Sequence, residues 1–232
     1  MKLKRLLSVL DVCECTADPE LDIRDISFDS RTTQPGDLFA AVCGYESDGH
    51  RFIGAAAERG VAVVLCQRKP EVEIPYILVA DSRLALSRIC CEFFDNPSRE
   101  LTMIGVTGTN GKTTTTYLLK QLLERCLGAK VGLIGTNQNM IGDAVLSAER
   151  TTPDALTLQR LLREMAEADA KMIEKYKEAI KKEDQVSESE YERRLTVCKT
   201  CELLNAGTCG ACGCYVELRA AAAVSKCPYK KW

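Results

Sequence analysis

A glycine-rich turn between an apolar run and an amphipathic segment constrains this chain more than any other feature. Residues 101–108 (LTMIGVTG) have the composition of a buried strand, and residues 112–126 repeat leucines at helical spacing. Between them the sequence reads Gly-Thr-Asn-Gly-Lys-Thr. Glycines allow backbone N–H groups to approach phosphate oxygens, and the first turn of a helix directs its positive end at an anion. The sequence therefore predicts a phosphate-binding turn at the start of a helix.

The residue types within this turn predict separate roles in phosphate binding. Lys112 can reach the β- and γ-phosphates of a nucleotide, and the Thr113 hydroxyl can ligate Mg²⁺. The common P-loop pattern has a further glycine five residues before Gly111, where this chain has Val106. A tight strand-to-helix turn that contains Gly-Lys-Thr by chance is the alternative interpretation.

Length and charge exclude several classes of protein. The 232 residues are enough for one or two domains with a substantial core. A formal net charge of −2 argues against general binding to nucleic acid or to a membrane surface. No window approaches the roughly 18–20 apolar residues of a membrane span, and residues 1–15 are predicted to form a helix rather than a signal peptide. We therefore expect a cytoplasmic protein without a membrane or nucleic-acid partner.

The periodicity of apolar residues predicts an α/β protein in four segments. A mixed α/β domain is followed by the start of a parallel-sheet domain of the P-loop type. A charged helical linker, in which Ser187 and Glu190 could form a capping box, leads to a small cysteine-rich module. The predicted bounds of the four segments are 1–98, 99–165, 166–197 and 198–232.

Individual elements are predicted within the first two segments. Short apolar runs at 61–66 and 76–80 indicate buried strands. After the glycine-rich turn and its helix, residues 130–136 are predicted to form the next strand of a βαβ unit. A further amphipathic helix is predicted over 154–165, opened by a Thr-Pro pair at 152–153.

The turn and several longer stretches resemble a known enzyme family. TGTNGKTTT (107–115) after a strand is the form found in the Mur ligases, which join amino acids to the peptidoglycan precursor. Residues 29–64, beginning DSRTTQPGDLF, are similar to the N-terminal domain of the E-type members of that family. GLIGTNQNMIGD (132–143) and RTTPDALTLQRLLREM (150–165) continue the similarity. The resemblance covers residues 1–165.

This resemblance implies ligands for the residues at matching positions. Ser30 resembles a contact to the UDP part of a UDP-N-acetylmuramoyl-peptide substrate, and a turn cap within residues 29–31 is the alternative. Thr151 and Thr152 resemble contacts to the same substrate, although a Thr-Pro pair alone would indicate a helix entry. The implied ATP site comprises Gly108, Thr109, Asn110, Gly111, Lys112, Thr113 and Thr114.

The resemblance also implies a reaction. In such a ligase a substrate carboxylate attacks the γ-phosphate of ATP, and an amine then displaces phosphate from the resulting acyl phosphate. After residue 165 the family should supply a further acidic metal ligand, a histidine, an arginine and a modified lysine, and none of these motifs is present. His50, the only histidine, is interpreted as a structural turn residue. We therefore expect a truncated front end that binds ATP and Mg²⁺ with negligible turnover, and we assign no catalytic residue.

The cysteines are unevenly distributed along the chain. Of the 13, seven are scattered from Cys13 to Cys126 and six crowd between Cys198 and Cys227. Two C-x2-C pairs close together predict a Zn²⁺ site, since Zn²⁺ takes four thiolates in tetrahedral geometry. An iron–sulfur cluster, a redox dithiol and buried free thiols are the alternatives. One Zn²⁺ needs only four of the six, and the choice stays open. The candidate ligands are Cys198, Cys201, Cys209, Cys212, Cys214 and Cys227.

Residues 166–232 resemble a second family, of small bacterial cysteine-rich proteins that end in a Cys-Pro…Lys-Trp tail. Those proteins tend to begin with a segment similar to LLREM (161–165), which also fits the ligase helix. We hypothesise that two coding sequences were joined at this shared stretch, naturally or by an assembly error. The expected protein is a truncated ligase front end fused to a zinc-binding module. The alternative is a non-catalytic nucleotide- and metal-binding protein whose module docks a protein partner.

Overall fold

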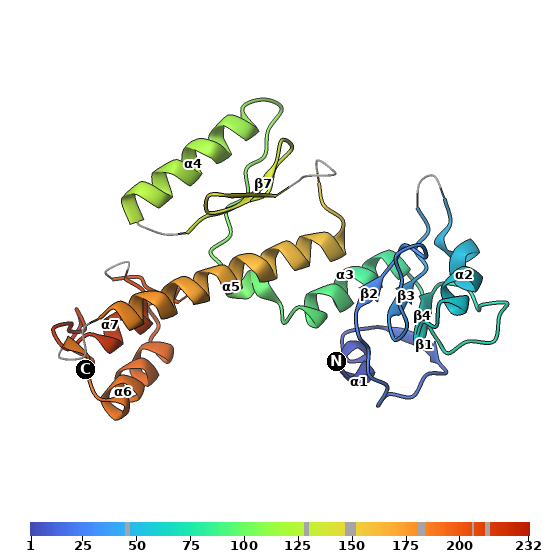
Figure 1. Cartoon of the computed structure of the whole chain (residues 1–232), viewed down its shortest axis with the longest axis horizontal. Helices are drawn as coiled ribbons and strands as arrows, with labels where there is room; N and C mark the ends of the chain where they lie inside the picture. Colours follow the sequence, from blue (N-terminus) through green and yellow to red (C-terminus); the bar gives the residue numbers. More distant parts are fainter. Residues whose placement is uncertain (45–46, 128–129, 147–151, 181–183, 206, 212–213) are drawn as a thin grey trace. The chain divides into compact units, whose positions relative to one another are not determined.

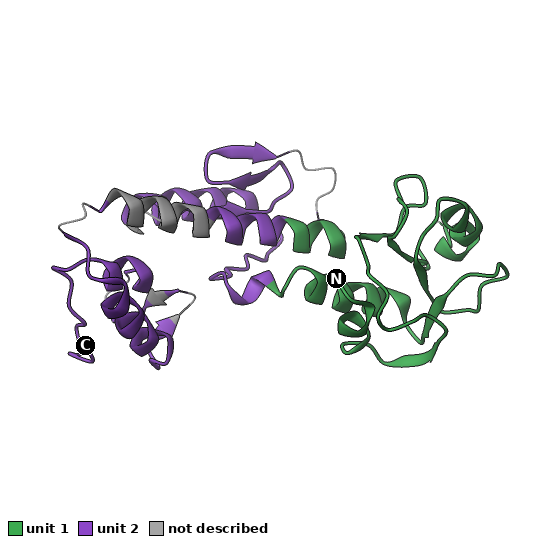
Figure 2. Ribbon diagram, turned by 60° about the horizontal axis from the view of Figure 1, so that its bottom comes forward, with its two compact units in different colours: residues 1–96, 153–160 green, residues 97–152, 161–232 purple. Residues whose placement is uncertain are grey.

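The computed structural model divides into two compact units, coloured separately in Figure 2. Unit 1 comprises residues 1–96 and 153–160, and unit 2 comprises residues 97–152 and 161–232. The bounds predicted for the four segments remain predictions. The structure describes residues 1–44, 47–127, 130–146, 152–180, 184–205, 207–211 and 214–232.

Unit 1 is built on a five-stranded mixed sheet, of which β1, β2, β3 and β4 are labelled in Figure 1. Its strands are β1 (Val12–Cys15), β2 (Ile26–Ser27), β3 (Leu38–Ala40), β4 (Val63–Cys66) and β5 (Tyr76–Val79). In the order β1-β5-β4-β3-β2, the strands β2 to β5 pair in parallel, and β1 pairs antiparallel with β5 at one edge. The strands predicted from the apolar runs at 61–66 and 76–80 are thus confirmed as β4 and β5.

Both faces of this sheet are covered, which explains the unbroken apolar runs. The helices of unit 1 before residue 97 are α1 (Leu3–Leu7), the short 3-10 helix η1 (Gly49–Phe52), α2 (Ile53–Glu58) and α3 (Ser82–Phe93). Leu38 and Leu65 face one core, which they share with buried residues of α1 and α3. Phe39 and Val64 face a second core, which they share with buried residues of α2. Because successive side chains alternate between two buried faces, every position of β4 favours an apolar residue.

The helix α5 (Ala155–Ala179) begins in unit 1 with a capped first turn. The Asp154 carboxylate accepts hydrogen bonds from the backbone N–H and the hydroxyl of Thr157, each at 2.9 Å. The predicted helix at 154–165 is therefore confirmed, but its cap is Asp154 rather than the preceding Thr-Pro pair. A carboxylate satisfies the free N–H groups of a first turn and also opposes the helix dipole.

Two side chains bind the start of α5 to unit 1. Leu156 is buried in the core that contains Leu38 and Leu65. Arg160 forms an ion pair with Asp25, with the nitrogen and oxygen 3.1 Å apart. The helix continues past residue 165 without interruption, so the predicted change of segment there does not coincide with a helix end.

Unit 2 begins with a helix and a small antiparallel sheet. Its elements up to residue 146 are η2 (Pro97–Arg99), α4 (Lys112–Leu127), β6 (Gly132–Leu133), β7 (Asn139–Ile141) and β8 (Ala144–Leu146). The helix predicted after the glycine-rich turn is confirmed as α4. The three strands form a meander in the order β6-β7-β8, with both pairings antiparallel.

The predicted βαβ unit is not formed in the part of the chain that the structure describes. Residues 102–107 adopt no strand, and Met103 and Ile104 are 57% and 56% exposed. The second predicted strand, at 130–136, is reduced to β6 and pairs antiparallel with β7. A parallel strand forms only where a neighbour takes up its N–H and C=O groups, and no described strand lies beside residues 102–107. The prediction of a strand at 101–108 was wrong for this reason, whereas β6 lies within the predicted range 130–136 but lacks the predicted parallel pairing.

The cysteine-rich end of unit 2 contains short elements around a small core. They are α6 (Glu188–Lys199), the hairpin of β9 (Leu204–Asn205) and β10 (Thr208–Cys209), and α7 (Val216–Ala221). The buried residues of this core are Leu195, Val216 and Ala220. Half of the predicted capping box is present, because Ser187 Oγ accepts from the Glu190 backbone N–H at 3.4 Å. Within the described ranges, no helix combines the length and the apolar content that crossing a bilayer demands.

The two-sided core of unit 1 predicts a large cost for truncating a central strand residue. Leu65→Ala should lower the free energy of unfolding by about 2–5 kcal/mol, because it leaves a cavity in a fully buried site. Leu84→Ala is the matched control, because Leu84 is 49% exposed on α3 of the same unit, and it should cost less than about 1 kcal/mol. Urea denaturation followed by circular dichroism measures both. Equal losses in the two variants would contradict the packing described.

Candidate functional site

The glycine-rich turn forms as an exposed loop that runs directly into α4. Gly108 and Gly111 have φ angles of 146° and 79°, values that residues with a side chain rarely adopt. The helix begins at Lys112, and the backbone N–H of Thr115 donates to the Gly111 carbonyl at 2.9 Å. The first N–H groups of the helix therefore stand free at the end of the turn.

Lys112 folds back over this loop. Its Nζ atom donates to the carbonyl oxygen of Gly108 at 2.6 Å and lies 3.4 Å from that of Thr109. The ammonium is exposed and sits beside the loop backbone, within reach of an anion that the turn would hold. Thr113 is half-buried at the first turn of α4, where its hydroxyl is available for a metal ion. The local geometry is thus compatible with a nucleotide phosphate and Mg²⁺.

Ser30 lies half-buried in the turn that follows β2. The capping role in this turn belongs to Asp29, whose Oδ1 atom accepts from the Arg31 backbone N–H at 2.9 Å. The Arg31 guanidinium also donates to Asp29, and these two contacts hold the pKa of the Asp29 carboxyl below its ordinary value. Among the described residues the Ser30 hydroxyl has no hydrogen-bond partner. It is therefore available to a ligand.

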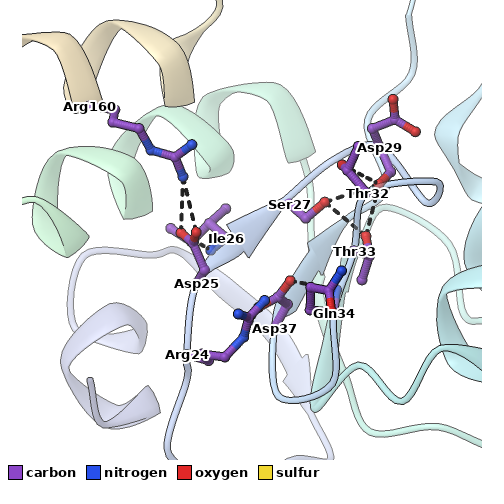
Figure 3. A network of polar contacts seen from close by, with 10 residues as sticks. All are labelled: Arg24, Asp25, Ile26, Ser27, Asp29, Thr32, Thr33, Gln34, Asp37 and Arg160. Carbon is purple, nitrogen blue, oxygen red and sulfur yellow. Dashed lines mark hydrogen bonds and ion pairs between the residues drawn. The ribbon is translucent and has the colours of Figure 1, made fainter.

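A polar network holds the loop that carries Ser30, as Figure 3 shows. The hydroxyls of Ser27 and Thr33 lie 2.8 Å apart, and Thr33 is only 1% exposed. Both hydroxyl oxygens also lie within hydrogen-bond distance of the Asp29 carbonyl oxygen, at 3.2 and 2.9 Å, so one hydroxyl donates to this carbonyl and the other donates to its hydroxyl neighbour. Because buried hydroxyls are costly unless paired, this network fixes the path of the loop.

The end of the loop is held by a buried carboxylate, also drawn in Figure 3. Asp37 accepts from the Arg24 guanidinium at 2.8 Å and from the Gln34 backbone N–H at 2.8 Å. The roles of Arg24, Gln34 and Asp37 were not predicted from the sequence. The available signal was the polar run SFDSRTTQPGD (27–37), which begins at the end of β2, but its composition does not indicate which polar groups pair.

The remaining predicted substrate contacts lie before α5. Thr152 is exposed, and Thr151 lies outside the described residues. Ser30 belongs to unit 1 and Thr152 to unit 2, so the structure assigns them to different units.

A second group of chemically reactive side chains lies after β3. The potential ligand atoms of Cys43, Asp48 and His50 all lie within 4.8 Å of one another. His50 Nε2 accepts a hydrogen bond from the Gln67 backbone N–H at 2.9 Å. The ring proton of neutral His50 is therefore on Nδ1, which donates to Asp48 Oδ1 at 2.7 Å. A metal ion would need the lone pair that this proton occupies.

The contacts of Asp48 support a structural role for this group. Hydrogen bonds from the backbone and ring of His50, and from the Arg68 guanidinium, hold the pKa of the Asp48 carboxyl far below its ordinary value. Burial and the neighbouring carboxylate raise the pKa of the Cys43 thiol, so the thiol is not activated. The interpretation of His50 as a turn residue agrees with this arrangement.

Four of the six clustered cysteines line one pocket of unit 2. Cys198, Cys201, Cys209 and Cys227 face it, together with apolar residues and the C-terminal residue Trp232. Burial would raise the pKa of the Cys227 thiol, but backbone N–H groups of residues 229, 231 and 232 hydrogen-bond its sulfur and hold the pKa below its ordinary value.

Of the other two clustered cysteines, only Cys214 lies among the described residues. Cys214 is exposed, and its sulfur accepts from Arg219 at 3.4 Å. Cys212 lies outside the described residues. The helix α6 continues past the predicted linker end at residue 197 to Lys199, so Cys198 lies in its last turn and Cys201 follows it.

Family models match three parts of the chain. Residues 22–93 match the Mur ligase family, catalytic domain, and residues 106–192 match the Mur ligase middle domain. Residues 157–232 match a family of unknown function (DUF6171). The Mur ligase middle-domain match and the DUF6171 match overlap over residues 157–192. The boundary between the two similarities is therefore a range of residues rather than a single position.

Individual relatives agree with the first two models. A UDP-N-acetylmuramoyl-L-alanyl-D-glutamate–2,6-diaminopimelate ligase of Clostridium tetani is 42% identical over 173 residues, which cover 72% of this chain and 36% of the relative. A second ligase with this name, numbered 1 in Clostridium acetobutylicum, is 43% identical over 168 residues, which cover 71% of this chain and 34% of the relative. The chain thus spans about a third of the length of these relatives.

A solved structure supports the fold. The structure of a UDP-N-acetylmuramoyl-L-alanyl-D-glutamate–2,6-diaminopimelate ligase aligns with a TM-score of 0.56 at 24% identity, over 73% of this chain and 34% of that one. The resemblance predicted for residues 1–165 is therefore confirmed. The first two thirds of this chain have the sequence and the α/β fold of the N-terminal and middle domains of the Mur ligase family.

Proposed function

We propose that residues 1–165 bind ATP with Mg²⁺ and a UDP-N-acetylmuramoyl-peptide, the two ligands of a Mur ligase front end. The observation that carries the proposal is the glycine-rich turn, where Lys112 and the start of α4 converge on one exposed loop. The family match over residues 22–93 and 106–192 supports the same ligands. Peptidoglycan synthesis in the cytoplasm is the corresponding process.

Each predicted residue has a role in this proposal. Residues 108–114 hold the ATP phosphates, and Thr113 ligates Mg²⁺. Ser30 contacts the UDP part of the substrate, and Thr151 and Thr152 also contact the UDP-muramoyl substrate. The names of the relatives specify 2,6-diaminopimelate as the amino acid that they add. For this chain the identity of the added amino acid stays open, because the proposal gives none of the described side chains a role in binding it.

We expect binding without appreciable turnover. A Mur ligase reaction forms an acyl phosphate, and its transition state needs charge stabilisation beyond the phosphate turn. From residue 166 to 232 the sequence contains no histidine and matches the family of unknown function. The second candidate is a non-catalytic nucleotide- and metal-binding protein, and it is favoured by the pocket that four cysteines line. In that candidate the module binds Zn²⁺ and presents a surface to a protein partner.

Removing the lysine of the turn tests nucleotide binding. Lys112→Ala should weaken binding of a non-hydrolysable ATP analogue by about 10- to 100-fold, because a charge-assisted contact to phosphate is lost. Isothermal titration calorimetry with Mg²⁺ present measures the change. Lys4→Ala is the control, since Lys4 is exposed in unit 1 and pairs with Glu20. Equal affinity of both variants and the parent protein would refute the assignment of residues 108–114.

A pair of neighbouring variants separates substrate contact from turn capping. Ser30→Ala should change the free energy of unfolding by less than about 0.5 kcal/mol, because the Ser30 hydroxyl has no partner among the described residues. It should weaken binding of UDP-N-acetylmuramoyl-dipeptide by about 3- to 10-fold, the loss of one hydrogen bond. Asp29→Ala should instead destabilise unit 1 by about 1 kcal/mol through loss of the turn cap. Destabilisation by Ser30→Ala with unchanged affinity would favour the cap interpretation.

Metal removal tests the cysteine-rich module. We expect about one equivalent of Zn²⁺ per chain, with folding energy on the order of 10 kcal/mol coming from coordination. Acid should release the metal, because thiolates bind protons as the pH falls. Chelator should abolish hydrogen-exchange protection in residues 198–232 and leave unit 1 protected. A metal-free chain that keeps this segment protected under reducing conditions would contradict the expectation.

A further inference from the structure

We propose that Cys198, Cys201, Cys209 and Cys227 are the four ligands of a single Zn²⁺, and that the C-terminal residues 228–232 close over it. Cys214 is outside the ligand set. This inference rests on the proposed metal binding of the module and specifies which thiols carry it. The coordination would release the four thiol protons to solvent and leave a centre of net charge −2.

The fold brings these four thiols together from separate parts of the module. Cys198 lies in the last turn of α6, and the backbone N–H of Cys201 donates to the Cys198 carbonyl at 3.1 Å, so a tight turn presents this pair. Cys209 ends β10, and Cys227 lies in the segment after α7. All four are half-buried and line one pocket, whose other walls are largely apolar. Four soft ligands in an apolar pocket suit Zn²⁺ better than a hard cation.

Donors from the C-terminal tail already point at two of the sulfurs. The Trp232 indole N–H donates to Cys198 Sγ at 3.2 Å, and Lys231 Nζ donates to Cys201 Sγ at 3.3 Å. A thiolate accepts such bonds better than a thiol, and metal-bound sulfur commonly has partners of this kind. The Lys231 ammonium would also offset part of the negative charge of the four thiolates.

The tail is fixed by an independent contact. The Arg194 guanidinium lies over the Trp232 ring, 4.7 Å from its centroid. Arg194 also donates to Glu190 at 2.8 Å and to the Ala222 carbonyl at 3.2 Å. Trp232 is therefore held between a helix residue and a sulfur, and the pocket is closed on that side by the end of the chain.

Metal binding must draw the sulfurs inward. Tetrahedral Zn²⁺ has metal–sulfur distances of about 2.3 Å, which places its sulfurs about 3.8 Å apart. Among the residues that the structure describes, only the group of Cys43, Asp48 and His50 brings three ligand atoms within 4.8 Å of one another. The cysteine pocket is thus wider than its metal-bound form. We expect the tail and the β9–β10 hairpin to move inward together on binding.

Cys214 is placed differently from the four proposed ligands. It is exposed, and its sulfur accepts from the guanidinium of Arg219, a residue of α7. Its carbonyl accepts from the Cys209 backbone N–H at 2.9 Å, which positions Cys209 in the hairpin. Cys214 therefore provides a matched cysteine for comparison within the same module.

Single-cysteine variants of the full chain test the ligand set. Protein is loaded with Zn²⁺ under reducing conditions, and affinity is measured by competition with a chromophoric chelator. Cys227→Ser should lower the affinity by more than about 100-fold, beyond the 10- to 100-fold typical of groups that only orient a ligand. Cys214→Ser should change it by less than about 3-fold. Trp232→Phe keeps the ring over Arg194 but removes the N–H, and it should lower affinity by about 10-fold.

The outcomes distinguish failure of the proposed ligand set from failure of the proposed Zn²⁺ binding. Parent protein that binds no Zn²⁺, or that purifies with a brown iron–sulfur chromophore, overturns the zinc proposal itself. A different result would overturn only the ligand set. In it, the parent protein binds one Zn²⁺, Cys214→Ser or Cys212→Ser loses the metal, and Cys209→Ser keeps it. Trp232→Phe keeps all six thiols, so it tests the tail even if Cys227→Ser fails to fold. Unchanged affinity in Trp232→Phe refutes the closure by the tail.

Discussion

Hydrogen bonding between neighbouring strands is the constraint on which the rest of this structure depends. In unit 1, β3 and β4 each have a partner on both sides, and helices cover both faces of the sheet. Strand pairing and helix packing fix where these strands end. The loop over residues 27–37 is therefore held at one end by β2 and at the other by β3. In the described part of unit 2 no strand pairs with residues 102–107. The glycine-rich turn nevertheless forms, because two glycine φ angles and the start of α4 determine it locally.

The same distinction explains which elements could be predicted from the sequence. The strands β4 and β5 are four-residue apolar runs: every position of β4 is buried, and β5 alternates between half-buried and buried positions. The helix α4 follows from its leucine spacing. The strand expected at 101–108 has an equally apolar sequence, but its pairing depends on partners elsewhere in the chain. Apolar composition indicates that a segment tends to be buried, but it does not indicate whether a partner strand is present beside it.

Candidate site residues divide in a similar way. The glycine-rich turn is contiguous, so its composition and order predict it directly. The pairing of Ser27 with Thr33 and the capping by Asp29 depend on a loop path that the sequence does not specify. For the cysteines, spacing indicates a metal site but leaves six candidates. The contacts of Trp232 with Cys198 and of Lys231 with Cys201 join residues 34 and 30 positions apart, which no local pattern encodes.

The two units therefore depend on different sources of stability. Unit 1 buries side chains on both faces of a sheet and needs no ligand to do so. Among the described residues, the core formed by α6 and the cysteine-rich module contains three buried residues, and a core of that size does not reach stability by burial alone. Under the proposed coordination, a free Zn²⁺ concentration 100 times its Kd would add about 2.7 kcal/mol to the module. The order of the C-terminal tail would then follow the available metal, whereas unit 1 would stay folded without it.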